Sequence, residues 1–179
     1  MKHALVIGGT GMLARTSLWL ADNGYHVSVI GRNPEKMQRL IEQNPAQIAP
    51  VLVDYTNKEA LEAQLLHIQQ KKGPVGLVVA WIHTNGSEVI SCLTDSIPSH
   101  LSWKLFHVNG SSSNLEEIKK KAAVPSHVQY HQIHLGFKLE NGTSRWLTHE
   151  EISGGVIKAI MEEKAIQLVG TLTPWEERP

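Results

Sequence analysis

The feature that most constrains this chain is a glycine-rich turn that directly follows an apolar run near the N-terminus. Residues 4–7 are apolar and predict a buried strand, whereas Leu13, Leu18 and Leu20 lie at helical spacing just downstream. Between them the chain reads Gly8-Gly9-Thr10-Gly11-Met12-Leu13-Ala14. Glycines allow the backbone to approach a phosphate closely, and the Met12 and Leu13 amides at the start of a helix attract anions. The sequence therefore predicts a phosphate-binding turn, with a merely tight strand–helix turn as the alternative.

Short apolar runs alternate with longer helical segments along the rest of the chain. This alternation is typical of β-α-β units and of a parallel sheet covered on both faces. We therefore expect one α/β domain over residues 1–179, a three-layer, doubly wound Rossmann fold with about seven strands. The predicted strands are 4–7, 27–30, 48–53, 75–81, 103–108, 128–135 and 166–169, and the predicted helices are 12–23, 35–43, a segment from 56 to about 72, 87–94, 114–122 and 152–163.

Local signals support several of these boundaries. Gly24 is expected to end the first helix, and Asn33-Pro34 supplies an N-cap and an N1 proline for the second. Pro50 places the third strand at an edge of the sheet, because proline cannot donate a ladder hydrogen bond. The sequences Thr56–Glu59 and Thr148–Glu151 each predict a capping box that opens a helix.

Charge and composition exclude several classes of function. The chain has 17 basic and 17 acidic side chains, so it lacks the positive charge expected of a protein that binds nucleic acid or anionic membranes. Its apolar runs are shorter than a signal peptide or a membrane span requires, and it contains one cysteine. We expect a cytoplasmic protein without nucleic-acid or membrane partners, and a homo-oligomer and a monomer are both compatible with the sequence.

The end of the second predicted strand indicates which dinucleotide would bind. Sites that prefer NAD usually present a carboxylate here to the ribose 2′-hydroxyl. This chain instead reads Ile30-Gly31-Arg32-Asn33, and Arg32 can offer two hydrogen bonds to a 2′-phosphate. The residues favour NADP over NAD, although a solvated arginine in a turn is the alternative.

With these residues the sequence resembles the short-chain dehydrogenase/reductase superfamily, whose members are NAD(P)-binding Rossmann proteins. The resemblance rests on the Gly8–Ala14 turn, on Arg32 and on Val53-Asp54, and it implies the strand order 3-2-1-4-5-6-7. It also implies that Asp54 contacts the adenine and that the backbone of Leu135-Gly136-Phe137 holds the nicotinamide carboxamide. The cofactor site expected from the turn, the strand ends and this resemblance comprises Gly8, Gly9, Thr10, Gly11, Met12, Leu13, Arg32, Asn33, Asp54, Ala80, Trp81, Asn109, Gly136 and Phe137.

The chain departs from that family where the proton donor should lie. The family carries a Tyr-x-x-x-Lys motif between strands five and six, but residues 110–127 contain no tyrosine. The asparagine-rich end of the family's fourth strand is replaced by residues 79–83, Val-Ala-Trp-Ile-His. Ser111 is the best positional match to the family's catalytic serine.

Three side chains near the predicted strand ends are candidates for catalysis: His83, Ser111 and His134. Histidine or a serine hydroxyl can give or relay a proton near pH 7. The alternatives are a solvent-facing loop for His83, a helix cap for Ser111 and a satisfied strand-end histidine for His134. Tyr130 lies inside a predicted strand, where packing with a bonded hydroxyl is expected, and we expect no metal site because His131 and His134 point to opposite faces.

The sequence predicts an NADP-dependent oxidoreductase of the short-chain dehydrogenase type. It would transfer hydride to or from a small carbonyl, quinone or imine substrate enclosed by residues 136–148. A non-catalytic NADP(H)-binding sensor or regulatory protein is the alternative, because the tyrosine and lysine are missing. Another nucleotide or a coenzyme diphosphate at the same turn is a third possibility.

Overall fold

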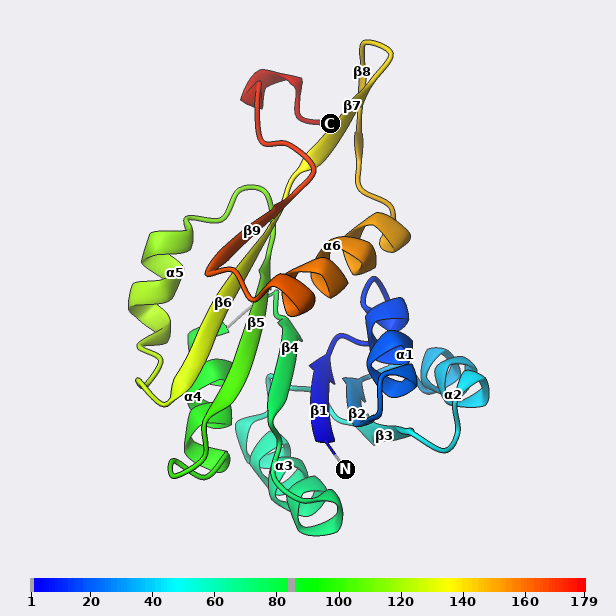
Figure 1. Cartoon of the computed structure of the whole chain (residues 1–179), viewed down its shortest axis with the longest axis vertical. Helices are drawn as coiled ribbons and strands as arrows, with labels where there is room; N and C mark the ends of the chain where they lie inside the picture. The colour runs from blue at the N-terminus through cyan, green and yellow to red at the C-terminus, as the bar shows by residue number, and fades with distance from the viewer. Residues whose placement is uncertain (1, 84–85) are drawn as a thin grey trace.

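A seven-stranded parallel sheet forms the centre of the molecule (Figure 1). The structure is a computed structural model and describes residues 2–83 and 86–179. The strand order is β3-β2-β1-β4-β5-β6-β9, so the order predicted from the family resemblance is confirmed, with β9 as the seventh strand of that prediction. The strands of this sheet are β1 (Lys2–Ile7), β2 (Tyr25–Gly31), β3 (Ile48–Leu52), β4 (Leu77–Trp81), β5 (Trp103–Asn109), β6 (Val128–Leu135) and β9 (Ile166–Val169).

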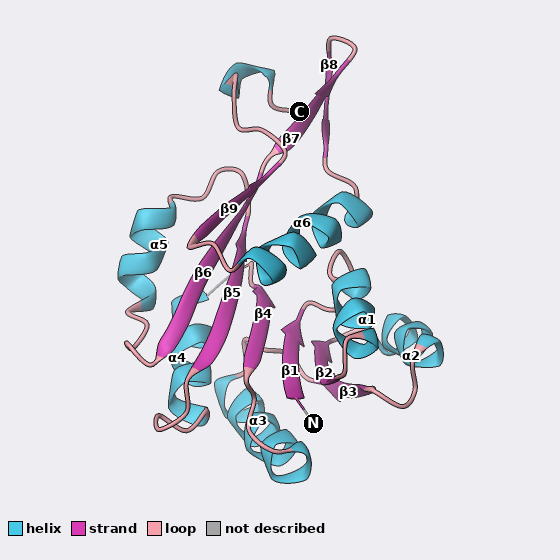
Figure 2. Cartoon of the chain, viewed as in Figure 1, coloured by secondary structure: helices cyan, strands magenta, loops and turns pink. Residues whose placement is uncertain are grey.

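Helices cover both faces of this sheet, as the predicted three-layer fold requires (Figure 2). Helices α1, α2 and α6 pack on one face around Leu20, Met37 and Val156, whereas α3, α4 and α5 pack on the other. The helices are α1 (Ala14–Asp22), α2 (Pro34–Gln43), α3 (Lys58–Lys72), α4 (Gly86–Ser96), α5 (Leu115–Ala122) and α6 (His149–Glu162), with a short 3-10 helix at Trp175–Glu177.

Most of the predicted boundary signals act as expected. Asn33 caps α2, and Thr148 with Glu151 forms the predicted capping box of α6. Gly24, with φ of 82°, follows α1, and Pro50 lies in β3, an edge strand. The predicted capping box at Thr56–Glu59 is wrong: Asn57 caps α3 through the Ala60 amide, because the Thr56 hydroxyl donates to Asp54 instead, at 2.7 Å.

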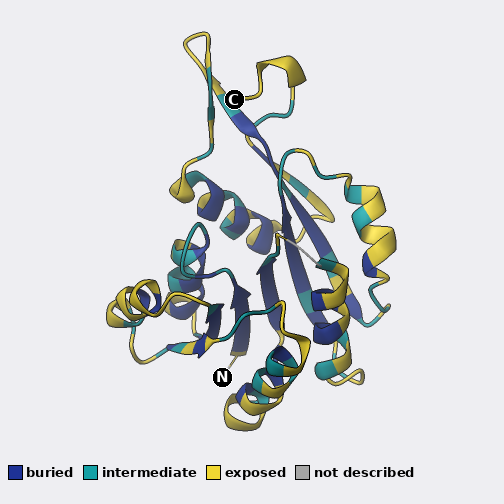
Figure 3. Ribbon diagram, turned by 180° about the vertical axis from the view of Figure 1, so that it is seen from behind, coloured by how far each residue is buried: buried dark blue, intermediate teal, exposed yellow. Residues whose placement is uncertain are grey.

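An antiparallel hairpin, which the sequence analysis did not predict, projects beyond the carboxyl end of the sheet. It consists of β7 (Phe137–Glu140) and β8 (Thr143–Trp146), joined by Asn141-Gly142, both with positive φ. Figure 3 shows that the hairpin tip is exposed, in contrast to the buried strands of the main sheet. The predicted flap at residues 136–148 therefore contains regular structure.

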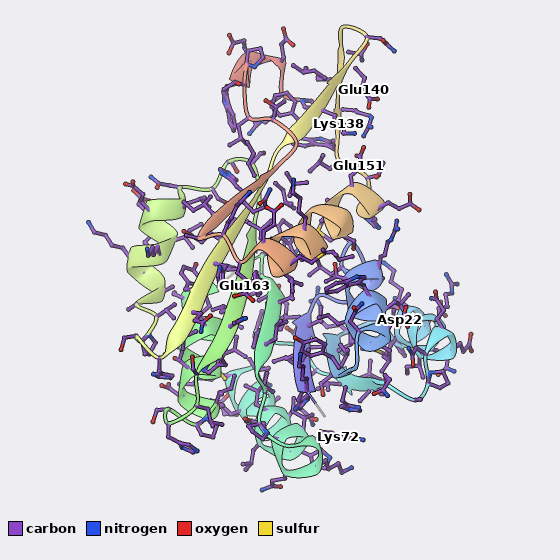
Figure 4. The ribbon with its side chains drawn as sticks, viewed as in Figure 1. Asp22, Lys72, Lys138, Glu140, Glu151 and Glu163 are labelled. Carbon is purple, nitrogen blue, oxygen red and sulfur yellow. The ribbon has the colours of Figure 1, made fainter. Side chains whose placement is uncertain are left out.

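Charged side chains fix the hairpin to the start of α6. Arg145 donates two hydrogen bonds to Glu140, at 3.0 and 3.1 Å, and two to Glu151, at 2.9 and 3.0 Å. Lys138 also approaches Glu151, with a nitrogen–oxygen distance of 2.7 Å, and Figure 4 shows Lys138, Glu140 and Glu151 gathered at this junction. These contacts hold the pKa of Glu151 well below its usual range, mainly through the hydrogen bonds from Arg145. The hairpin thus leaves the sheet in a defined direction.

Candidate active site

The glycine turn lies between β1 and α1, where the order of the strands reverses between β1 and β4. Gly8 adopts φ of 81°, a left-handed conformation that favours glycine. Helix α1 begins at Ala14, and its N-cap Leu13 provides no side-chain hydrogen bond. Within residues 2–83 and 86–179, the amides of Met12 and Leu13 donate to no protein acceptor. They remain available to an anion at the start of the helix.

Glycine is required at position 9 of this turn for packing, but not at position 11. A Cβ on Gly9 would lie 2.7 Å from the Ser17 hydroxyl and 2.8 Å from a Val29 methyl group, so Gly9 permits α1 to pack on the sheet. A Cβ on Gly11 would meet nothing within 4 Å and would point into open space. Gly9 has no side chain and the side chain of Leu13 is buried, so both residues can contact a ligand only through the backbone.

A cleft of about 610 Å³ begins at this turn and runs across the end of β2. The lining residues come from the turn and from the segment after β2. They are Gly8, Thr10, Gly11 and Met12 in the turn, Arg32, Asn33 and Lys36 after β2, and, farther along the chain, Tyr55, Trp81, His83 and His149. The chemistry of this lining suits a dinucleotide: free amides face the position of a diphosphate, and two cations lie where the adenosine ribose is expected.

Arg32 lies at the predicted position but is paired with Asp54. Their closest nitrogen–oxygen distance is 3.5 Å, and the two side chains are 70% and 44% exposed, so the pair is weak. Asp54 also accepts hydrogen bonds from the amide and hydroxyl of Thr56, which lower the pKa of its carboxyl group more than Arg32 does. Sequence reasoning missed Lys36, one turn into α2; the side chain of Asn33 is used to cap that helix.

A second cleft, of about 330 Å³, continues from Met12 toward the hairpin. Trp146 and Leu147 contribute the hairpin side, and Gly136 and Ser111 lie at the ends of the central strands. The Gly136 amide donates to Val169, and the Phe137 amide donates to Thr171, at 2.8 and 2.9 Å. Both amides are thus already used within the protein, so neither is free for the carboxamide contact that the family resemblance implied.

The three predicted catalytic side chains lie at different depths. Ser111 lines the second cleft, whereas His134 bonds to the carbonyl oxygen of Ser111, at 3.2 Å, and fixes this loop. His83 is exposed beside Trp81, whose indole N–H donates to His83 Nε2 at 2.6 Å. This bond leaves Nδ1 of His83 as its proton-bearing nitrogen when the ring is neutral.

Besides Gly9 and Leu13, four predicted cofactor residues do not line the two clefts described so far: Asp54, Phe137, Ala80 and Asn109. Ala80 is fully buried in the core between the sheet and the helices α3 and α4. Asn109 is buried on the same face of the sheet, and its amide nitrogen donates to the carbonyl oxygen of His107 at 2.8 Å. Because strand residues alternate between faces, both side chains point away from α1 and α6.

Comparison with known proteins decides the family. A model of the short chain dehydrogenase family matches residues 2–112, more than half of the chain. The chain belongs to this family. A comparison with curated protein sequences found no match.

Solved short-chain dehydrogenases share the fold of this family member. One from Streptomyces avermitilis superposes with a TM-score of 0.68 at 13% identity, covering 94% of this chain and 88% of that protein. A second, described as a short-chain dehydrogenase/reductase from Sinorhizobium meliloti 1021, gives a TM-score of 0.69 at 13% identity, with 95% and 94% covered. At this identity the structural likeness establishes the fold alone.

Membership of the short chain dehydrogenase family makes this chain an oxidoreductase that uses a nicotinamide cofactor on a small molecule. In the described part of the chain, no cluster of three or more His, Cys, Asp or Glu side chains is arranged to hold a metal ion. No described helix is both long and apolar enough to cross a membrane.

Proposed function

We propose that this protein is an NADP-dependent oxidoreductase that acts on a small carbonyl, quinone or imine substrate, or on the corresponding reduced compound. The observation that carries the proposal is that Arg32 and Lys36 line the same cleft as the glycine turn. Two cations near the adenosine ribose favour a 2′-phosphate, which carries about two negative charges near pH 7. The exposed Arg32–Asp54 pair can open at little cost when such a phosphate arrives.

The residues of the chain divide the work of binding between backbone and side chains. The Met12 and Leu13 amides hold the diphosphate, while Arg32 and Lys36 select the phosphorylated ribose. When bound, the dinucleotide supplies or accepts the hydride. Trp146, at the end of β8, and Leu147 line the second cleft, where Ser111 faces the substrate.

Proton transfer in this proposal does not use the family's tyrosine and lysine. Helix α5 (Leu115–Ala122) and the loop before it contain no tyrosine. His83, with Nδ1–H left free by the bond from Trp81, and Ser111 are the groups proposed to give or relay the proton. His134 acts through the loop backbone and is a positioning residue.

Calorimetric titration of NADPH and NADH tests the cofactor assignment. We expect NADPH to bind more tightly, and we expect Arg32→Ala to weaken NADPH roughly 10- to 100-fold, the range of a charge-assisted hydrogen bond. Lys36→Ala should weaken NADPH as well, and both variants should leave NADH nearly unchanged. Arg178→Ala is the matched control, since Arg178 packs on Trp175 near the C-terminus. Equal affinities of the wild-type protein for the two dinucleotides would contradict the NADP assignment.

Turnover distinguishes the enzyme from a non-catalytic NADP(H) sensor, the alternative favoured by the missing tyrosine. NADPH oxidation is followed across a panel of carbonyl, quinone and imine compounds, with His83→Gln and Ser111→Ala as variants. The enzyme proposal predicts turnover that both variants lower by a larger factor than any loss of NADPH affinity, since His83 also lines the first cleft. Tight binding with no turnover across the panel would favour the sensor.

A further inference from the structure

One face of strands β5 and β6 is polar although it lies inside the protein. His107 and Asn109 of β5 are only 4% and 5% exposed, and Gln132 of β6 is 2% exposed. Earlier on the same face, Trp103 and Leu105 pack in the apolar core with α4. The change from apolar to buried polar side chains along one strand requires hydrogen-bonding partners nearby.

Of these polar side chains, His107 and Asn109 border a third cleft, of about 480 Å³, which we call the α5 cleft, whereas Gln132 donates to the Leu115 carbonyl oxygen of α5. His107 and Asn109 line its sheet side, Ile90 of α4 and Ile118 of α5 line its apolar walls, and Ser112 is at the loop after β5. Helix α5 leaves this space because Ala122 is the only buried residue of the helix, all of whose residues are described. The cleft is therefore formed by a small helix that covers the sheet incompletely.

His107 is held in position by a tyrosine from the neighbouring strand. Its Nδ1 lies 2.9 Å from the Tyr130 hydroxyl oxygen. Burial lowers the pKa of His107 to about 4 and raises the pKa of Tyr130, so both groups are neutral at pH 7. Since Nδ1 is bonded to Tyr130, Nε2 is the ring nitrogen left for a ligand. The tautomer can adjust, so this nitrogen can either donate to a carbonyl oxygen or accept from a hydroxyl group.

Lys121 provides the charge of the α5 cleft. Among the described residues that line the cleft there is no carboxylate, and no described acidic side chain forms an ion pair with Lys121. The exposed Lys121 on α5 thus faces a space whose other lining groups are His83, uncharged polar groups and apolar groups. A single cation beside neutral hydrogen-bonding groups suits a small molecule with one anionic group.

We propose that the α5 cleft binds a small hydroxy or keto acid, with its carboxylate at Lys121 and its hydroxyl or keto oxygen at His107. The binding of this acid does not rest on the proposed function, but its oxidation or reduction does, because the acid has to move from His107 into the second cleft, where Ser111 lies. Trp81, Gly110 and Ser112 line both this cleft and the one beside Gly136, so the two spaces are neighbours. The acid would therefore enter beside the position expected for the nicotinamide ring.

Covalent labelling tests this binding without any cofactor. Diethyl pyrocarbonate modifies neutral imidazole, and mass spectrometry of peptides at pH 6 reports the rate at His107. We expect His107 to react, and we expect 20 mM lactate or pyruvate to slow its reaction about threefold, as for a ligand at about twice its dissociation constant. Lactamide, which has the same shape without the charge, should give no protection.

Two surface variants make the test specific. Lys121→Gln should abolish protection by lactate and pyruvate, whereas Lys119→Gln, on the same helix, should preserve it. An unreactive His107, equal protection by lactamide, or protection that survives Lys121→Gln would overturn the proposal. The separate NADPH titration shows which proposal fails. Protection of His107 without NADPH binding would contradict only the redox function, and NADPH binding without protection would contradict only the binding of the acid.

Discussion

The strand ends that lead into the loops differ between the two halves of the sheet. From Ala4 to Ile7 in β1 and from Leu77 to Ala80 in β4, every residue is apolar and buried. In β5 and β6 the face beneath α5 instead carries His107, Asn109 and Gln132. The first half presents its candidate ligand site mainly through backbone amides at a glycine turn, and the second half presents its site through side chains. A backbone site can be placed on an apolar core, whereas a side-chain site interrupts that core.

Glycines show the same contrast in the loops that follow these strands. At Gly9 a side chain would collide with other side chains, but at Gly136 a Cβ would lie 2.0 Å from the Thr171 carbonyl oxygen and 2.7 Å from its carbon. Backbone cannot move aside as a flexible side chain can. The junction between β6 and the hairpin is therefore the less tolerant of the two positions.

The largest expected effect is that of Gly136→Ala. The clash with Thr171 must displace β7 or the segment after β9, so we expect a loss of about 3 kcal/mol or more in the free energy of unfolding. Urea denaturation measures it. Gly154→Ala in α6 is the control, because its Cβ meets nothing within 4 Å and alanine favours the helix, with an expected gain of about 0.5–1 kcal/mol. Equal stability of the two variants would mean that this junction rearranges freely.

This contrast also explains how much the sequence predicted. The strands and the turn at Gly8–Ala14 followed from apolar runs and glycines, because these patterns are local, whereas the strand order came from the family resemblance. The α5 cleft could not be predicted from the sequence, because His107 and Tyr130 are 23 residues apart in the chain and meet only when β5 pairs with β6. The hairpin could have been found, because Asn141-Gly142 is a typical two-residue hairpin turn. The ion pairs between the hairpin and α6 could not have been predicted from the sequence, because they depend on the direction in which the hairpin leaves the sheet.

Acid should reveal the buried histidine of the α5 cleft. In the unfolded chain a histidine takes up a proton near pH 6.5, but folded His107 stays neutral down to about pH 4. Its contribution to stability is therefore complete above about pH 6.5 and is lost as the pH falls toward 4. A shift of this size corresponds to about 3 kcal/mol, so denaturant unfolding at a series of pH values should show this decline.

Variants assign the decline to its source. His107→Gln removes the titrating group, so its stability should fall less between pH 6.5 and 4 than that of the wild type. Some decline should persist, because burial also lowers the pKa of His3 and His26. The exposed His100→Gln should follow the wild type. If His107→Gln and the wild type lost the same stability in acid, the imidazole would be solvated and the α5 cleft would be more open than described.

The smallest expected changes in stability concern the glycine turn, where they separate packing from binding. Gly9→Ala should lower the free energy of unfolding by about 1–3 kcal/mol, because its Cβ meets Ser17, Val29 and Val6 within 3 Å. Gly11→Ala should leave stability within about 0.5 kcal/mol, since its Cβ points into open space. Gly11 lines the first cleft, so Gly11→Ala should nevertheless weaken NADPH binding about tenfold or more. Calorimetric titration of NADPH into both variants, at a temperature where Gly9→Ala is folded, compares their affinities. Undiminished NADPH affinity in Gly11→Ala would mean that the diphosphate does not pass this turn. The backbone site of the first half would then have to lie elsewhere.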